Sequence, residues 1–376
     1  MELAIIVGVV VVTARVFDFT NGFHDTANAM ATSIATGALR PRVAVLIAAV
    51  LNLVGAFLSV EVARTISSGL VDEALITPTV IFAGLVGAIL WNLLTWLLGL
   101  PSISSHALFG GLIGATWVAA GADAVRFGAV AGKVLLPAVL SPIVAGLVAL
   151  IATVLAYRIT QRAARATVTR GFKAGQIVSA SMVALAHGTN DAQKTMGVIT
   201  LTLITAGSLP ANAAPPFWVI ASAGLAIALG TYLGGWRIIQ TLGKRVGEIE
   251  TPQGFAAETS SAALIFASSH LGFALSTTQV ATGSIFGAAA GRRIATVQWS
   301  VAGRMAVAWL VTLPAAAAVG AVAALTAQTG TAGTIVVAIA LVAVSGGIYA
   351  ASRRRPVTAE NVNDVPAGKQ PVPATA

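Results

Sequence analysis

The chain has 376 residues, of which 57% are hydrophobic and only 9% are charged, and its mean hydropathy is +0.88. A soluble domain carries about 25% charged residues, so this chain lacks the polar side chains that a water-facing surface needs, and lipid must cover most of it. The net charge of +9 does not predict nucleic-acid binding, because the basic residues fall in short loops between apolar runs, where they orient membrane proteins. The sequence has no cysteine, which excludes disulfides and thiolate metal sites.

Eleven apolar segments predict an all-α polytopic membrane protein, since a helix needs about 20 apolar residues to cross a bilayer. Two of them, 3–36 and 175–206, are longer than that, and each holds a polar cluster with glycine, at 21–28 and 187–194. We expect broken helices there, because irregular backbone at membrane depth is tolerated where it lines a cavity. The other segments are 41–60, 78–98, 103–120, 134–157, 216–236, 252–274, 275–290, 300–325 and 334–351.

Loop charge predicts the orientation of the chain. The loop 158–174 carries Arg158, Arg162, Arg165, Arg170 and Lys173 and no acid, so it should be cytoplasmic. We therefore expect a multi-pass protein of the cell (inner) membrane with its N-terminus outside and its C-terminus cytoplasmic. The other basic residues expected on the cytoplasmic side are Arg40, Arg42, Arg237 to Arg245, Arg292, Arg293 and Arg353 to Arg355.

The chain contains an internal repeat. Aligning Asp25 with Asp191 also aligns Gly22 with Gly188, and S-S-H-A-L-F-G-G-L-I-G (104–114) aligns with T-T-Q-V-A-T-G-S-I-F-G (277–287). By the charge-derived orientation the two copies run in opposite directions, and such inverted repeats place a transporter's substrate site between them, near the midplane. The predicted units are a first transmembrane repeat (1–157), a basic cytoplasmic loop (158–174), a second repeat (175–325), an extra transmembrane helix (326–351) and a disordered cytoplasmic tail (352–376).

Asp25 and Asp191 are ionisable groups inside apolar runs, where they cost several kcal/mol and mark an ion or substrate path. The alternative is a pair of hydrogen-bonding clamps between helices. Neighbours at helical spacing share a face with each aspartate. The candidates for coupling to a cation or a proton are Asp25, Asn28, Asp191, Asn190, Asn21, His24, His187, Lys194 and Gln279, with Asp25 and Asp191 as candidate metal ligands.

Two hydroxyl clusters occupy repeat-related positions, and each precedes a glycine-spaced run. Pro101 before the first suits a helix start, where free N–H groups and the helix dipole favour an anion. A neutral cradle of this kind can bind phosphate and still release it. The alternative is that the hydroxyls bond back to their own helices. The candidate phosphate ligands are Ser102, Ser104, Ser105, Ser276, Thr277 and Thr278.

The remaining polar residues of the apolar segments have two interpretations. The four histidines, His24, His106, His187 and His270, could carry protons near neutral pH or donate structural hydrogen bonds. Arg15 and Asp18 have the i, i+3 spacing of an internal ion pair. Glu258 and Arg304 lie in or near apolar segments and could be functional.

At these residues the chain resembles the inorganic phosphate transporter (Pit) family, bacterial low-affinity type. The resemblance lies in the paired motifs G-F-H-D-T-A-N (22–28) and G-T-N-D-A-Q-K (188–194), and in P-S-I-S-S-H and S-T-T-Q. It implies two inverted repeats with hairpin or re-entrant segments. It also implies that Asp25, Asn28, Asp191 and Asn190 face cations, and that the hydroxyl pairs face phosphate. The bacterial branch is proton-linked and carries phosphate complexed with a divalent metal such as Mg²⁺.

These features predict a phosphate symporter rather than an enzyme, because two carboxylates would repel phosphate unless a cation accompanies it. The coupling ion is expected to be H⁺, with Mg²⁺ as co-substrate and no permanently bound cofactor. Na⁺ stays an alternative, although the segment 41–60 offers only Asn52 where sodium-coupled relatives carry a glutamate. A passive anion channel is a further alternative, whereas a hydrolase would need a nucleophile motif such as G-x-S-x-G. Sulfate or arsenate as substrate, and a homodimer, are left open.

Overall fold

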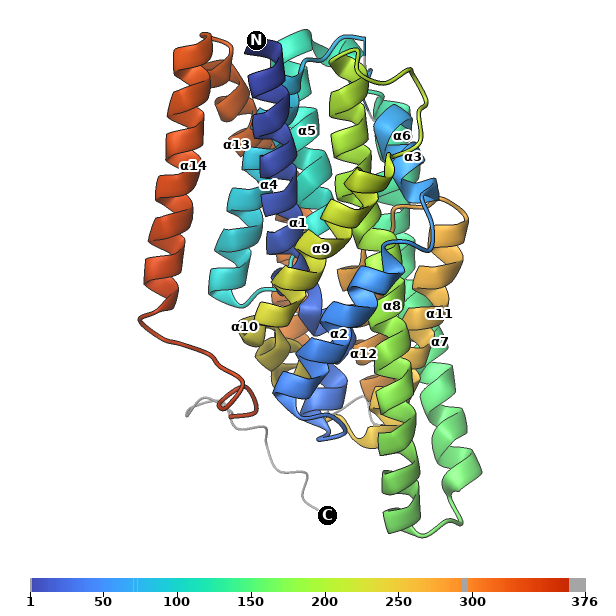
Figure 1. The fold of residues 1–376 in the computed structure, drawn as a ribbon. Coiled ribbons are helices and arrows are strands. Elements are labelled where there is room, and N and C mark those ends of the chain that lie inside the picture. Colours follow the sequence, from blue (N-terminus) through green and yellow to red (C-terminus); the bar gives the residue numbers. More distant parts are fainter. Residues whose placement is uncertain (1, 70, 73, 293–296, 365–376) are drawn as a thin grey trace.

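The computed structural model describes residues 2–69, 71–72, 74–292 and 297–364. Within these ranges the chain is a bundle of helices with no β-strand (Figure 1). The helices are α1 (Glu2–Ala35), α2 (Pro41–Gly55), α3 (Glu61–Gly69), α4 (Pro78–Leu98), α5 (Ser104–Ala120), α6 (Phe127–Val130), α7 (Leu136–Thr160), α8 (Arg165–Thr205), α9 (Phe217–Leu233), α10 (Trp236–Gln240), α11 (Thr251–His270), α12 (Thr277–Arg292), α13 (Trp299–Ala327) and α14 (Thr331–Ser352), with short turns at η1 (Ala122–Ala124), η2 (Ala131–Leu135) and η3 (Thr241–Arg245).

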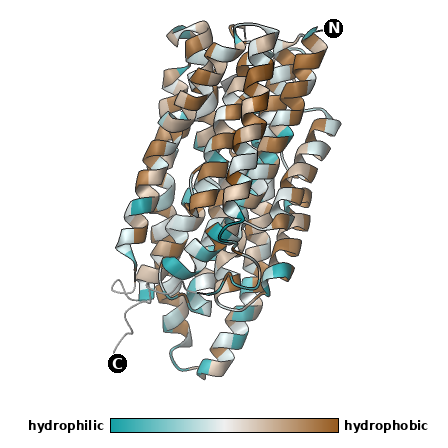
Figure 2. Ribbon diagram, turned by 90° about the vertical axis from the view of Figure 1, so that its left-hand side faces the viewer, coloured by the Kyte–Doolittle hydropathy of each residue, from teal (hydrophilic) through white to brown (hydrophobic). Residues whose placement is uncertain are grey.

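Each predicted apolar segment contains a helix, but not every one of these helices has the length and composition of a membrane span. Five helices of the described chain are long and apolar enough to span one, or six if α9 and the α10–η3 segment, bent by 59°, form one crossing. The prediction of an all-α membrane protein is confirmed, whereas the count of eleven is not. Hydrophobic residues predominate along the length of the bundle (Figure 2). Many large ones are exposed, among them Leu147, Leu310 and Val342, as contact with lipid requires.

The expected breaks in the two long segments are wrong. Helix α1 runs unbroken over 34 residues and α8 over 41. The glycines of the polar clusters serve close packing instead: a Cβ on Gly22 would lie 2.3 Å from the carbonyl oxygen of Ile227 in α9, and one on Gly188 would lie 2.2 Å from that of Asn52 in α2. Small residues let membrane helices approach to backbone contact, so these glycines join helices without interrupting them.

Two helical hairpins, α4–α5 and α11–α12, confirm the expected hairpin segments. The inner helices α5 and α12 have 17 and 16 residues, which gives about 25 Å of length at 1.5 Å per residue, less than the hydrocarbon core of about 30 Å. Helix α5 ends near the N-terminal end of the bundle and α12 near the opposite end (Figure 1). The starts of both helices, at Ser104 and Thr277, therefore lie inside the bundle.

The two repeats are interleaved in space. The inner helix of each hairpin packs by backbone contact on a helix from the other repeat, α5 on α13 and α12 on α7. The paired positions are related by constant offsets along the chain, as an inverted repeat requires. Four glycines make these contacts, and a Cβ added to any of them would lie 2.4 Å or less from a carbonyl oxygen of the facing helix. The pairs are Gly110 with Leu313, Gly114 with Ala317, Gly283 with Pro142, and Gly287 with Gly146.

Helix α1 begins at one end of the bundle, and α14 ends at the opposite end (Figure 1). That second end, called here the basic end, also holds the turn between α1 and α2, with Arg40, and the end of α7, with Arg158. Arg237 lies there too, because it donates to the carbonyl oxygens of Ser352 and Arg355. The predicted loop 158–174 is wrong in extent, because α7 continues to Thr160 and α8 begins at Arg165; both helices extend past the apolar runs that marked them. Arg293 lies outside the described residues.

The tail is also more ordered than expected. Residues 353–364 fold back on the basic end, where Val362 is buried and Gln240 Nε2 donates to the carbonyl oxygen of Asp364 at 2.9 Å. The prediction of disorder is therefore wrong for these residues, because one apolar side chain packs on the bundle and backbone carbonyl groups accept hydrogen bonds from α10. The predicted tail residues 365–376 lie outside the described residues.

Candidate functional site

Asp25 of α1 and Asp191 of α8 meet in the interior of the bundle, each at most 1% exposed. His187, one helical turn before Asp191, lies between them: its Nε2 is 3.3 Å from Asp191 Oδ2 and 4.0 Å from Asp25 Oδ2. Ligand atoms of these three residues all lie within 4.8 Å of one another. The repeat thus brings together the two carboxylates that the sequence places 166 positions apart.

The carboxylate of Asp25 is surrounded by hydrogen-bond donors from three elements. Its Oδ1 lies 2.7 Å from His24 Nδ1, and it also accepts from Thr278 Oγ1 at 3.3 Å. Its Oδ2 accepts from Ser104 Oγ at 2.6 Å. Ser104 and Thr278 stand at the N-terminal ends of α5 and α12, so both hairpins reach the same aspartate.

The carboxylate of Asp191 has a formal counter-charge. Lys194 Nζ, fully buried, lies 2.6 Å from its Oδ1. Its Oδ2 accepts from Thr277 Oγ1 at 3.2 Å and from Asn21 Nδ2 at 3.4 Å. The amide of Asn190, in the orientation that satisfies both of its ends, donates to Asp191 Oδ1 at 3.1 Å and accepts from a hydroxyl of α11.

The hydroxyl pairs join the two repeats. Asn28 Nδ2 donates to Thr277 and Thr278 at 3.4 and 3.1 Å. Lys194, which occupies the position of Asn28 in the second copy, donates to Ser105 Oγ at 2.7 Å. Each motif helix therefore bonds the hydroxyl pair of the other repeat, and Ser104, Ser105, Thr277 and Thr278 line one cluster with the two aspartates.

Further polar residues hold the histidines in place, and two of them, Thr95 and Thr231, are not predicted from the sequence. His24 Nε2 lies 3.3 Å from Thr95 Oγ1 and 3.2 Å from Ser102 Oγ. His187 Nδ1 lies 3.1 Å from Asn52 Oδ1, and the amide of Asn52 donates to Thr231 Oγ1 at 2.8 Å. Ser102 is thus a partner of His24 and not of an aspartate. Thr95 and Thr231 lie in mostly apolar helices, where a threonine gave no signal.

The structure does not bring Ser276 or the side chain of Gln279 to the aspartates. Ser276 Oγ accepts from the backbone N–H of Gln279 at 3.1 Å and so caps α12. The side chain of Gln279 donates to the carbonyl oxygen of Ala138 at 2.8 Å. Both residues contribute to the shape of the hairpin tip, a role that hydroxyl and amide groups at helix starts commonly take.

Other residues singled out from the sequence lie elsewhere. Arg15 and Asp18 form no ion pair in the described chain; the Arg15 guanidinium lies over the ring of Trp218 at 5.7 Å instead, so that prediction is wrong. Glu258 is buried away from the aspartates and accepts from Thr32 and Ser179 at 2.6 and 2.5 Å. His106 is buried in α5, whereas His270 and Arg304 are exposed.

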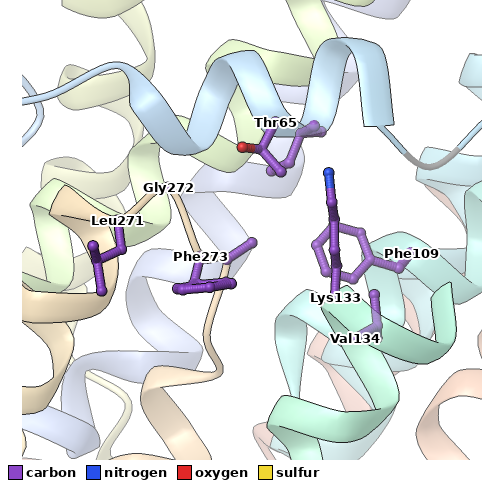
Figure 3. A pocket seen from close by; sticks show the side chains of 9 residues that line it. Thr65, Phe109, Lys133, Val134, Leu271, Gly272 and Phe273 are labelled. Carbon is purple, nitrogen blue, oxygen red and sulfur yellow. The ribbon is translucent and has the colours of Figure 1, made fainter. Parts of the chain in front are cut away.

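A cavity of about 150 Å³ lies between α3, α5, η2 and the loop after α11 (Figure 3). Its wall includes Phe109, one turn after Ser105 on α5, and Phe273 in the tip of the α11–α12 hairpin. Lys133 extends along it toward α3 (Figure 3). The cavity thus lies beside elements that carry the cluster, on the side away from the basic end.

The chemistry of the cluster suits both an anion and a cation. Two helix N-termini with hydroxyls favour an anion, and two carboxylates with hydroxyl oxygens are ligands for hard cations. The imidazole of His187 would also suit a transition metal. Lys194 offsets one of the two negative charges, so the cluster repels an anion less than two bare carboxylates would.

Known proteins of similar sequence identify the family of this chain. The sequence profile of the Phosphate transporter family matches residues 21–320, which include both aspartates and both hydroxyl pairs. The chain belongs to this family. A probable low-affinity inorganic phosphate transporter of Mycobacterium bovis is 57% identical over 94% of this chain and 86% of its own length. Proteins of the same name from Rhizobium meliloti and Bacillus subtilis are 44% and 42% identical, over 84% and 85% of this chain and 95% and 96% of theirs.

The fold of this family member is also that of a solved structure. A protein described as the sodium-dependent phosphate transporter superposes with a TM-score of 0.78 over 86% of this chain and 99% of its own. The two sequences are 23% identical, so this likeness concerns the fold. The interleaved inverted repeats and the paired hairpins belong to that shared fold.

Proposed function

We propose that this protein is a symporter of inorganic phosphate that is coupled to protons and carries phosphate complexed with a divalent metal such as Mg²⁺. The observation that carries the proposal is the meeting of two helix starts, with their hydroxyl pairs, and two aspartates from repeat-related helices in one buried cluster. The hydroxyls and helix N-termini would bind phosphate. The carboxylates would bind the accompanying cation.

The hydrogen bonds of the cluster suggest how the two ligands are coupled. Ser104 and Thr277 donate to Asp25 and Asp191, so the hydroxyls assigned to phosphate are engaged by the carboxylates. A cation on the carboxylates would take over their oxygens and release the hydroxyls for the anion. Phosphate therefore binds well only together with its cation, which is what symport requires.

The histidines favour protons as the coupling ion. His24 and His187 each lie within 3.3 Å of an aspartate oxygen, and imidazole exchanges protons near neutral pH. A divalent cation with hydrogenphosphate forms a neutral complex, which lowers the cost of placing the anion beside Asp25 and Asp191. Sodium coupling is the second candidate, because the fold is shared with a protein described as sodium-dependent.

The gathering of Arg and Lys at the basic end supports a cytoplasmic location of that end. We infer that the N-terminus is outside and the C-terminus cytoplasmic, in the cell (inner) membrane.

The test is uptake of radiolabelled phosphate into proteoliposomes with imposed gradients of H⁺, Na⁺ or Mg²⁺. Uptake should rise with an inward proton gradient and with Mg²⁺ and persist in sodium-free choline buffer. Asp25→Asn and Asp191→Asn should each abolish coupled uptake, whereas Asp123→Asn, at an exposed position, should not. Strict dependence of uptake on sodium would refute proton coupling. A phosphate flux that no cation gradient changes would indicate a channel.

A further inference from the structure

A third carboxylate lies on α1, two turns before Asp25, and the cluster described above does not use it. Asp18 is 0% exposed. Neither of its carboxylate oxygens has a hydrogen-bond partner within the described part of the chain. An ionised carboxylate in this situation costs several kcal/mol, so the side chain needs either a proton or a bound cation.

Among the residues that the structure describes, none forms an ion pair with Asp18. Arg15 is turned toward Trp218. The groups of α8 that act on Asp18 are the hydroxyl of Thr195 and, through their charges, Asp191, His187 and Lys194. Helices α4 and α9 also pack on α1, and their sequences contain no acidic or basic residue; their one titratable side chain, Tyr232 of α9, is exposed.

The oxygen count favours a proton over a metal ion. Sodium and magnesium sites use about six oxygen ligands. Of the described side chains that act on Asp18, Thr195 and Asp191 offer oxygens, and those of Asp191 already accept from Lys194 and Thr277. The Thr195 hydroxyl has no hydrogen-bond partner among the described residues. Such a set cannot replace the water shell of a metal ion, whereas a proton needs one oxygen.

The position of Asp18 connects it to the aspartate cluster. Asp18, Asn21 and Asp25 have i, i+3 and i+7 spacing and share one face of α1, and Asn21 donates to Asp191. In the second repeat the position that corresponds to Asp18 is Ala184, which is fully buried. The extra carboxylate is therefore found in one copy, in the half of α1 that leads from the N-terminal end to the cluster.

We propose that Asp18 is a proton-binding site of the transport cycle, which takes a proton as phosphate enters and releases it afterwards. This proposal rests on the proposed function above. The chemical step is protonation of one Asp18 carboxylate oxygen from water and its reversal. No bond of phosphate is made or broken.

The experiment measures two modes of transport in proteoliposomes. Phosphate exchange at equal pH needs substrate binding and the conformational change, whereas accumulation under an inward pH gradient also needs net proton movement, followed with an internal pH dye. Asp18→Asn imitates the protonated side chain. It should keep exchange within about twofold of wild type and lower proton-driven accumulation and proton entry at least tenfold. Asp123→Asn, an exposed aspartate, should change neither mode.

Each result decides the matter. Asp18→Asn with wild-type accumulation would overturn the proposal, and so would folded Asp18→Asn protein that has lost exchange together with accumulation, because Asp18 would then serve substrate binding or packing. If Asp18→Asn does not fold, Asp18→Glu should retain accumulation with a displaced pH profile, and an unchanged profile would overturn the proposal. Wild-type protein that neither exchanges nor accumulates phosphate would refute the proposed function instead.

Discussion

The buried ion pair of Lys194 and Asp191 gives the most direct test of the charge arrangement. Lys194 Nζ lies 2.6 Å from Asp191 Oδ1, and both residues are 0% exposed. Coulomb's law gives an attraction of about 6 kcal/mol at this distance with an effective dielectric constant of about 20. Removal of one partner leaves the other charge buried without compensation, which costs about 3–5 kcal/mol.

We therefore predict that Lys194→Met and Asp191→Asn each lower the free energy of unfolding by about 3–5 kcal/mol, whereas the double variant loses much less than the sum. The difference between the double variant and the two single ones, the coupling energy, should be at least about 2 kcal/mol. The measurement is denaturant-induced unfolding of purified protein in one detergent, followed by tryptophan fluorescence. Transport should not return in the double variant, because it still lacks the Asp191 carboxylate.

A surface pair of the same chain provides the control. Arg42 and Glu360 form an ion pair whose side chains are 81% and 62% exposed, and their alanine variants should show a coupling energy below about 1 kcal/mol. If the effects of Lys194→Met and Asp191→Asn add to within about 0.5 kcal/mol, Lys194 is not the counter-charge of Asp191, and the explanation of how the cluster tolerates an anion fails.

Three further predictions concern packing, orientation and pH. Gly188→Ala should prevent stable folding, because its Cβ would meet the Asn52 carbonyl oxygen at 2.2 Å, whereas Gly171→Ala, with open space around it, should be neutral or stabilising in a thermal-shift assay. Single cysteines at Ala164 and Ala211 should react with an impermeant maleimide from opposite sides of the membrane, the first from the cytoplasm; reaction of both from one side would contradict the orientation. Burial alone would raise the pKa of Glu250, but hydrogen bonds from Arg292 and Tyr157 lower it overall, so its ion pair stabilises the fold above the ordinary carboxyl pKa and is lost in acid. Unfolding temperatures of wild type and Glu250→Gln should differ at pH 7 and converge as the pH falls, and a constant difference would count against the ion pair.

The sequence predicted the parts of the fold that the bilayer dictates. The apolar runs located both ends of most membrane helices to within a few residues, because lipid contact leaves little choice of side chain. The meeting of Asp25 and Asp191 followed from their positions in an inverted repeat. The start of α5 followed from Pro101 and the serines after it.

The sequence did not predict which residues the glycines of the motifs contact. A glycine beside polar residues is equally compatible with a helix break and with close packing of two helices, and the partner that decides lies far away in the chain. The partner of Gly188 is Asn52, and that of Gly22 is Ile227. Likewise nothing local showed that Arg15 would turn to Trp218 and leave Asp18 without an ion pair.

Lys194 is a different case, because a local signal was present. Its i, i+3 spacing from Asp191 is that of a helical ion pair, and the structure forms that pair at 2.6 Å. Arg64 and Glu61 have the same spacing, are exposed, and also form an ion pair, at 3.1 Å. Spacing alone does not distinguish a buried counter-charge from a surface ion pair. Only the burial of the pair distinguishes them, and Asp191 is buried because α5 and α12 cover it.

Two departures from repeat symmetry change the formal charge of the interior. The second copy has Lys194 where the first has Asn28, and the first copy has Asp18 where the second has Ala184. With the histidines neutral, α8 contributes one positive and one negative charge to the interior, whereas α1 contributes two negative charges from Asp18 and Asp25. The imbalance of charge thus lies on one helix. For the proposed symporter this imbalance predicts that the cation binds nearer to α1 than to α8, because a proton or metal ion would lower the energy of the interior more on α1.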